Sequence, residues 1–233
     1  MSASNNETNH LPVLLWHGMG DTYDSESMKW VVEQLKRGQP DLNIYSIYID
    51  TDSDKDREAS VFGNVMVQLT DVCDQVKNLD VDIEKGFNGI GFSQGGLFIR
   101  SLAQTCNVTF HNIISVGSPQ NGIADLPPCD PSNWMCKKRN EYIKGKMYTK
   151  FMQENNIQAQ YYRDIDNYDT YLLKSSYLKF VNNELFKDLD YFNRLISLNK
   201  FVMIMFEKDE TLVPKESAWF WDIEAKTGII LSI

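Results

Sequence analysis

A single serine held between glycines constrains the fold of this chain more than any other feature. Ser93 stands in the pattern Gly91-x-Ser93-x-Gly95. Apolar residues lead into the pattern, and apolar residues at helical spacing follow it, which indicates a buried strand, a tight turn and a helix. Such a turn needs residues with almost no side chain on either side of the serine. The pattern is typical of a nucleophile elbow, so Ser93 is the candidate nucleophile; the alternative is a coincidental glycine-rich turn.

Strands and helices are predicted to alternate around this elbow. Strands are predicted at 11–16, 43–49, 113–117 and 200–206, and helices at 28–35 and 61–79, with a polar loop at 50–58. This order favours an α/β fold with a mainly parallel sheet and helices on both faces. Residues 123–199 interrupt the alternation, and we expect them to form an inserted helical cap over the carboxyl edge of the sheet. Residues 228–233 are expected to begin a further strand.

Length and charge limit the class of protein. The 233 residues are 42% hydrophobic, which fits one domain at 11–233 behind a polar tail at 1–10. The net charge is −9 and no basic run occurs, so nucleic acid is not an expected partner.

No apolar run approaches the roughly 20 residues that span a bilayer. The tail does not resemble a signal peptide. We expect a monomer.

Four cysteines, Cys73, Cys106, Cys129 and Cys136, suggest an oxidising compartment. They show no CxxC spacing and no companion histidines, so a metal site is not expected. No cofactor is expected either. The glycosylation sequons at Asn107 and at residues 6–8 agree with paired cysteines. The alternative is four buried thiols in a cytosolic protein, which the lack of a signal peptide would favour.

A nucleophilic serine requires hydrogen-bond donors for the oxyanion that it generates. In an elbow of this kind one donor is the backbone N–H of the next residue, Gln94. The second donor comes from the loop after an early strand, and Met19 in Gly18-Met19-Gly20 is the best candidate. The alternative for that loop is an ordinary glycine turn at the end of a strand.

A triad in this fold follows the order serine, acid, histidine. Asp209, just after the strand at 200–206, is the expected acid, and Glu207 and Glu210 compete with it. No histidine follows Asp209, because His10, His17 and His111 all precede it. His17 is expected to fix the Met19 loop by hydrogen bonding and not to act as the base.

Four sequence motifs together resemble the palmitoyl-protein thioesterases, a family of lysosomal enzymes. They are WHGMGD at 16–21, GFSQGG at 91–96, IISVG at 113–117 and KFVM at 200–203, followed by Asp209. The resemblance implies an α/β-hydrolase fold and the cleavage of long-chain fatty acyl thioesters from protein cysteines. It implies Ser93 as nucleophile, Asp209 as acid and the amides of Met19 and Gln94 as oxyanion hole. It also implies the disulfides Cys73–Cys106 and Cys129–Cys136.

The sequence departs from the family pattern at its end. Family members continue through a last strand to a Gly-Asp-His segment and a closing helix, and this sequence stops at Ile233 without them. The expectation is therefore an incomplete site with weak turnover.

The partners expected from the resemblance are S-acylated proteins or peptides and long-chain fatty acyl groups, in the lysosome or outside the cell. Six aromatic residues are candidates to line an acyl groove, and the alternative for each is an ordinary core or interface residue: Trp134, Tyr161, Tyr162, Trp219, Phe220 and Trp221. The competing functions are a non-catalytic fatty-acyl-binding protein and a generic lipase or esterase.

Overall fold

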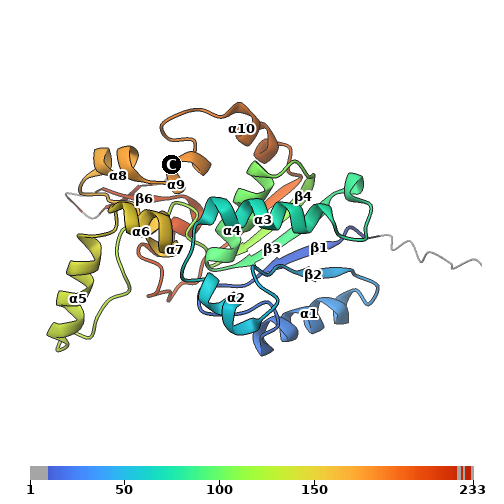
Figure 1. Cartoon of the computed structure of the whole chain (residues 1–233), viewed down its shortest axis with the longest axis horizontal. Helices are drawn as coiled ribbons and strands as arrows, with labels where there is room; N and C mark the ends of the chain where they lie inside the picture. The colour runs from blue at the N-terminus through green and yellow to red at the C-terminus, as the bar shows by residue number, and fades with distance from the viewer. Residues whose placement is uncertain (1–9, 225–226, 228, 232–233) are drawn as a thin grey trace, which may run out of the picture.

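A five-stranded parallel sheet forms the centre of the molecule (Figure 1). The computed structural model describes residues 10–224, 227 and 229–231. The strand order is β2-β1-β3-β4-β5, with every neighbouring pair parallel. The strands are β1 (Val13–Trp16), β2 (Ile44–Ser46), β3 (Phe87–Phe92), β4 (Phe110–Val116) and β5 (Lys200–Ile204). The chain leaves β1 toward β2 on one side and returns to β3 on the other, so the order reverses between β1 and β3.

Helices cover both faces of the sheet, because the strand side chains alternate between two apolar clusters. Val13, Leu15 and Ile90 pack with residues of α1 on one face. Leu14 and Trp16 point to the other face, which α3 and α4 cover. The helices that precede β4 are α1 (Glu26–Gly38), α2 (Ser53–Ala59), α3 (Val65–Lys77) and α4 (Gln94–Thr105). This arrangement confirms the predicted α/β-hydrolase class.

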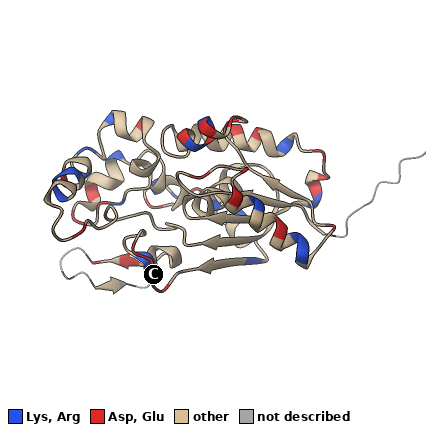
Figure 2. Cartoon of the chain, turned by 90° about the horizontal axis from the view of Figure 1, so that it is seen from below, with Lys and Arg blue, Asp and Glu red and all other residues tan. Residues whose placement is uncertain are grey.

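Six short helices separate β4 from β5. They are α5 (Trp134–Lys144), α6 (Lys150–Asn155), α7 (Ile157–Gln160), α8 (Tyr168–Lys174), α9 (Leu178–Val181) and α10 (Leu189–Ile196). Figure 1 places α5 to α9 beyond the carboxyl ends of the strands, whereas α10 packs against α4. Figure 2 shows acidic and basic residues mixed along the outer helices. Within the described ranges, no helix has both the length and the apolar character needed to cross a bilayer.

Two predicted elements differ from the structure. The polar stretch at 50–58, expected as a loop, contains α2, because the Asp52 carboxylate caps the helix by accepting hydrogen bonds from the amides of Asp54 and Lys55 at 3.1 and 3.2 Å. At the other end of the chain, Ile230–Leu231 is a strand, β7, but it pairs antiparallel with β6 (Asp222–Ile223) in a separate small sheet. The rest of the 228–233 stretch lies largely outside the described residues.

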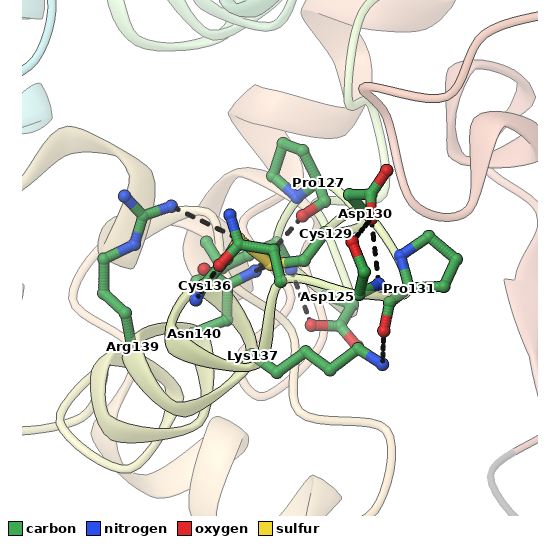
Figure 3. Close-up of a disulfide and its surroundings, with 12 residues drawn as sticks. Asp125, Pro127, Cys129, Asp130, Pro131, Cys136, Lys137, Arg139 and Asn140 are labelled. Carbon is green, nitrogen blue, oxygen red and sulfur yellow. Dashed lines mark hydrogen bonds between the residues drawn. A yellow bond between two sulfur atoms is a disulfide. The ribbon is translucent and has the colours of Figure 1, made fainter.

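Both disulfides that the resemblance implies are present. Cys73 of α3 is bonded to Cys106 at the end of α4, which ties together two helices on the same face of the sheet. Cys129 is bonded to Cys136 on α5, and the Asn140 amide contacts the Cys129 sulfur at 3.3 Å (Figure 3). No described cysteine is free, so the alternative of four buried thiols is wrong.

Candidate active site

The candidate site lies at the carboxyl edge of the sheet, where the strand order reverses. Ligands of open α/β sheets bind at such a reversal, because the loops from neighbouring strands diverge there and leave a crevice. A cavity of about 580 Å³ opens at this point. The loop after β1 contributes Met19 to its wall, β3 leads to Ser93, Gly117 follows β4, and Asp209 follows β5. The structure therefore brings together residues that are distant in the sequence.

Ser93 lies between β3 and α4. Its backbone has φ 51° and ψ −128°, a conformation that residues other than glycine rarely adopt. The flanking glycines allow the strand and helix to meet there. A Cβ built on Gly91 would lie 2.4 Å from the backbone of Gly95. A Cβ on Gly95 would lie 2.3 Å from the carbonyl oxygen of His17, at the end of β1. Glycine is thus required at both positions by close backbone contact.

The two candidate oxyanion donors flank Ser93 from different strands. Gln94 is the first residue of α4, where a backbone N–H has no partner within the helix. Gly18 to Asp21 forms a turn in which the amide of Asp21 donates to the carbonyl of Gly18 at 3.3 Å and Gly20 has φ 78°. With Met19 at negative φ this is a type II turn, which requires glycine at its third position. A Cβ on Gly18 would lie 3.1 Å from that of Ser93, so the loop is seated directly against the serine.

Asp209 borders the same cavity as Ser93. Its Oδ1 accepts hydrogen bonds from the amides of Thr211 and Leu212 at 2.8 and 3.0 Å, which fixes the side chain in its loop. Glu210 also borders the cavity, whereas Glu207 is exposed and does not border it. The structure therefore leaves Asp209 and Glu210 as the acids near the serine, and of these only Asp209 has a carboxylate anchored by backbone amides among the described residues.

The three histidines lie apart from Ser93 in the described part of the chain. His111 is exposed near the start of β4, with Nε2 3.1 Å from the Lys85 carbonyl, and His10 precedes β1, so both lie at the opposite edge of the sheet from the cavity. His17 is buried beside the site, but its Nδ1 lies 2.8 Å from the Gly18 carbonyl and its Nε2 lies 3.0 Å from Asp56 Oδ2. His17 thus anchors the Met19 loop, in agreement with the expected role.

Asp56 on α2 holds both ends of that loop. Besides the contact with His17, its Oδ2 accepts from the Tyr23 amide at 3.0 Å and its Oδ1 accepts from the Ile49 amide at 2.7 Å. Burial of the carboxyl raises its pKa, but the hydrogen bonds from His17, Ile49 and Tyr23 outweigh this effect and hold the pKa of Asp56 below its ordinary value. The carboxylate is therefore charged, and both of its oxygens are bound to neighbouring groups.

Two residues that hold the Met19 loop were not predicted from the sequence, because they fall in or just after the 50–58 stretch that was expected to be a loop. They are Asp56 and Ser60, whose Oγ accepts a hydrogen bond from the Gly20 amide at 2.7 Å. One local signal would have indicated the helix that carries them. Asp52 is a good N-cap, and the residues that follow include strong helix formers such as Lys, Arg, Glu and Ala. Nothing in the local sequence indicates which loop that helix contacts.

The cavity wall differs from the predicted aromatic groove. Of the six aromatic residues expected to line it, only Tyr161 does. Trp134 is 63% exposed on α5, Tyr162 is buried beside Tyr148, and Trp219 and Trp221 pack on each other. Phe220 packs against Phe201 and Arg100. The apolar wall instead comes from the strand ends and from the loops that follow them: Met19, Phe92, Val116, Ile123, Phe206 and Leu212.

An elbow serine at the reversal point of a parallel sheet, with loop amides beside it, defines an α/β hydrolase. Comparison with known proteins is more specific. Residues 12–233 match the family described as palmitoyl protein thioesterase, and the chain belongs to this family.

Two relatives show how far the similarity extends. Palmitoyl-protein thioesterase 1 of Caenorhabditis elegans is 35% identical over 217 residues, which is 92% of this chain and 72% of that protein. The palmitoyl-protein thioesterase-dolichyl pyrophosphate phosphatase fusion 1 of Schizosaccharomyces pombe is 36% identical over 98% of this chain, which spans 37% of the fusion's length.

Proposed function

We propose that this chain is a thioester hydrolase that removes long-chain fatty acyl groups from protein cysteines, with Ser93 as nucleophile. The observation that carries the proposal is the elbow: the strained serine, its two close-packed glycines and the cavity meet at one point. Ser93 Oγ attacks the thioester carbonyl and loses its proton to solvent or to an added base. The carbonyl oxygen becomes an oxyanion, and the amides of Met19 and Gln94 stabilise it. The cysteine thiolate then leaves, and water hydrolyses the acyl-serine to release the fatty acid.

The cavity fits an acyl chain in size and character. Its volume of about 580 Å³ lies within the usual range of small-ligand sites, roughly 300–1,000 Å³. Apolar side chains at or after the ends of four strands, together with Tyr161, form much of the wall. The polar residues that border it are Ser93, Gln158 and residues 208–211. An alkyl chain in this cavity would place its carboxyl end beside the serine.

We expect weak turnover from the 233-residue chain, because none of its histidines faces Ser93 in the described structure. A serine without a neighbouring base loses several orders of magnitude in rate but keeps the contributions of binding and of the oxyanion hole. Asp209 is proposed as the acid that would orient such a base.

The test is hydrolysis of a palmitoyl-cysteine peptide by the chain and by Ser93→Ala, with and without added imidazole. We expect imidazole to raise the wild-type rate, since it supplies the missing base, and to leave Ser93→Ala unchanged. Equal rates for the two proteins under all conditions would refute the proposal. Preference for the matching oxygen ester would favour a generic esterase, and saturable palmitate binding without any acyl-serine would favour an acyl-binding protein.

The disulfides and the family favour a compartment outside the cytosol, and we propose the lysosome. Asn107 is exposed in the turn between α4 and β4, which suits a glycosylation site. The sequon at 6–8 lies outside the described residues.

A further inference from the structure

We propose that Ser60, at the end of α2, is a positioning residue that holds the loop of Met19 and the residue Gln94, the two candidate oxyanion donors, in fixed positions relative to each other. This inference rests on the function proposed above. Ser60 is 4% exposed and sits beside the two loops that carry those donors. Its side chain binds the Met19 loop, and its backbone carbonyl binds the residue after the nucleophile.

The first contact fixes the orientation of one peptide group. Ser60 Oγ donates to the carbonyl of Arg57 at 2.6 Å and accepts from the amide of Gly20 at 2.7 Å. Because a hydroxyl has a single hydrogen and Arg57 takes it, the side of Oγ that faces the loop presents only lone pairs. The Met19–Gly20 peptide must therefore turn its N–H toward Ser60. This orientation is the one found in the type II turn.

The second contact anchors the first residue of α4. Gln94 is 2% exposed, and its Nε2 donates to the Ser60 carbonyl at 2.7 Å. The other end of the same amide group, Oε1, accepts from the hydroxyl of Tyr161 at 3.2 Å. Both polar atoms of the Gln94 side chain are thus satisfied, and the residue proposed to supply one oxyanion donor is bound directly to Ser60.

Ser60 therefore spans two loops that approach Ser93 from different strands. The geometry of an oxyanion hole depends on donors that do not move during the reaction, since reorganisation would cost part of the stabilisation. Loss of the hydroxyl would free the Gly20 amide and with it the turn that presents Met19. The carbonyl contact to Gln94 would remain, so the effect is expected to fall on one donor.

The experiment follows covalent modification of Ser93 by a long-chain alkyl fluorophosphonate in imidazole buffer. In this step an Oγ–P bond forms, fluoride leaves, and the hydroxyl proton passes to the buffer. The limiting rate and the half-saturation concentration are measured for the wild type, Ser60→Ala and Ser217→Ala. Ser217 is the matched control, because it is equally buried and its Oγ also donates to a carbonyl, that of Gly122, and accepts an amide, that of Asn121.

We expect Ser60→Ala to lower the limiting rate about tenfold or more, by analogy with the loss of one oxyanion donor, and to leave half-saturation within about twofold. Ser217→Ala should match the wild type in both. A Ser60→Ala rate within about twofold of the wild type, or a change confined to half-saturation, would overturn the inference.

A second measurement separates this inference from the proposed function. Hydrogen exchange of the Gly20 amide, followed by NMR, should accelerate in Ser60→Ala while core amides keep their protection. If Gly20 exchanges alike in both proteins, Ser60 does not hold the loop, whatever Ser93 does. If the wild type is not modified at Ser93 at all, the function fails and the positioning role fails with it, even where exchange shows that Ser60 holds the turn.

Discussion

The backbone of Ser93 is held at φ 51° and ψ −128°. In this region of φ/ψ space a Cβ is crowded by the backbone, whereas glycine meets no such clash. Strain of this kind costs of order 1–3 kcal/mol and persists only where the surroundings impose it. Here the surroundings are the hydrogen bond from the Ser93 amide to the Val116 carbonyl at 2.8 Å and the tight contact of Gly91 with Gly95. The serine is therefore placed by packing around it and not by its own preference.

From this strain we predict that Ser93→Gly is more stable than Ser93→Ala by about 1 kcal/mol, because only glycine relieves the crowding of the Cβ. Both variants lack the hydroxyl, so the comparison is independent of activity. Urea unfolding followed by circular dichroism measures the difference. Equal midpoints would mean that the elbow carries no backbone strain.

Asp56 gives a prediction on pH. Its two oxygens accept amides from Tyr23 and Ile49, and in Asp56→Asn the side-chain NH₂ leaves one of these amides unpaired, at a cost of about 1–3 kcal/mol. Because the folded-state pKa of Asp56 is lowered, the carboxylate stabilises the fold above its unfolded pKa of about 3.9, and this contribution is lost as pH falls through the folded pKa.

The stability gap between wild type and Asp56→Asn should thus be widest near neutral pH and narrow as the pH falls below about 4. Denaturant midpoints measured from about pH 7 to about pH 2 test this. Asp54→Asn is the control on the same helix, since the Asp54 side chain is 93% exposed. A gap of constant size across the range would contradict the role given to the Asp56 charge.

At the scale of elements, α4 and β1 meet without side chains between them. The backbone of Gly95 lies against the carbonyls of Trp16 and His17, where an added Cβ would come within 2.3–2.5 Å of the oxygens. Backbone atoms cannot yield as the end of a flexible side chain can. The position of the helix start, and so of Gln94, is fixed by this contact.

We therefore expect Gly95→Ala to destabilise the protein by more than about 2 kcal/mol, in the range of overpacked cores. Gly38→Ala is the matched control. Gly38 ends α1, nothing lies within 4 Å of an added Cβ, and alanine favours the helix, so its stability should stay equal or rise slightly. Thermal unfolding of the two variants provides the comparison, and a tolerated Gly95→Ala would show that the helix can shift away from β1.

At the scale of the whole molecule, Arg100 joins α4 to the segment beyond β4. It is 1% exposed, and burial lowers its pKa to about 10, so it stays charged at neutral pH. Its guanidinium donates to Gln120, Gln104, Asn182 and the Val181 carbonyl at 2.7–3.1 Å. The helix that follows Ser93, α4, is thereby bonded to α9 and to the loop after β4.

Arg100→Lys should cost about 3 kcal/mol, because an ammonium has three donors on one atom and cannot reach acceptors spread around a planar fork. Arg57→Lys, at an exposed surface pair with Asp54, should cost less than about 0.5 kcal/mol. Chemical denaturation gives both values. A small loss for Arg100→Lys would indicate that the segment between β4 and β5 is held by its apolar contacts alone.

The structural features that could be predicted from the sequence are those formed by residues close to one another along the chain. The strand, turn and helix around Ser93 were predictable because apolar spacing and glycines lie within about twenty positions of each other. The Arg100 bonds and the contacts of Asp56 and Ser60 were not. Several contacts of Asp56 and Ser60 join residues 33–40 positions apart, such as Tyr23 with Asp56 and Gly20 with Ser60, and no local pattern specifies such pairs. The cavity wall was mispredicted for the same reason, since strand ends and not an aromatic cluster form it.

The spread of the site over four strand ends has a consequence for synthesis. Asp209 lies 116 positions after Ser93 (209 − 93), and at 5–20 residues per second a ribosome needs about 6–23 s to make that stretch. The turn at Ser93 is complete on the growing chain while β5, the strand that leads to Asp209, has not been made. The nascent protein thus carries its serine through translation without Asp209, and the cavity closes around the two residues only after β5 joins the sheet.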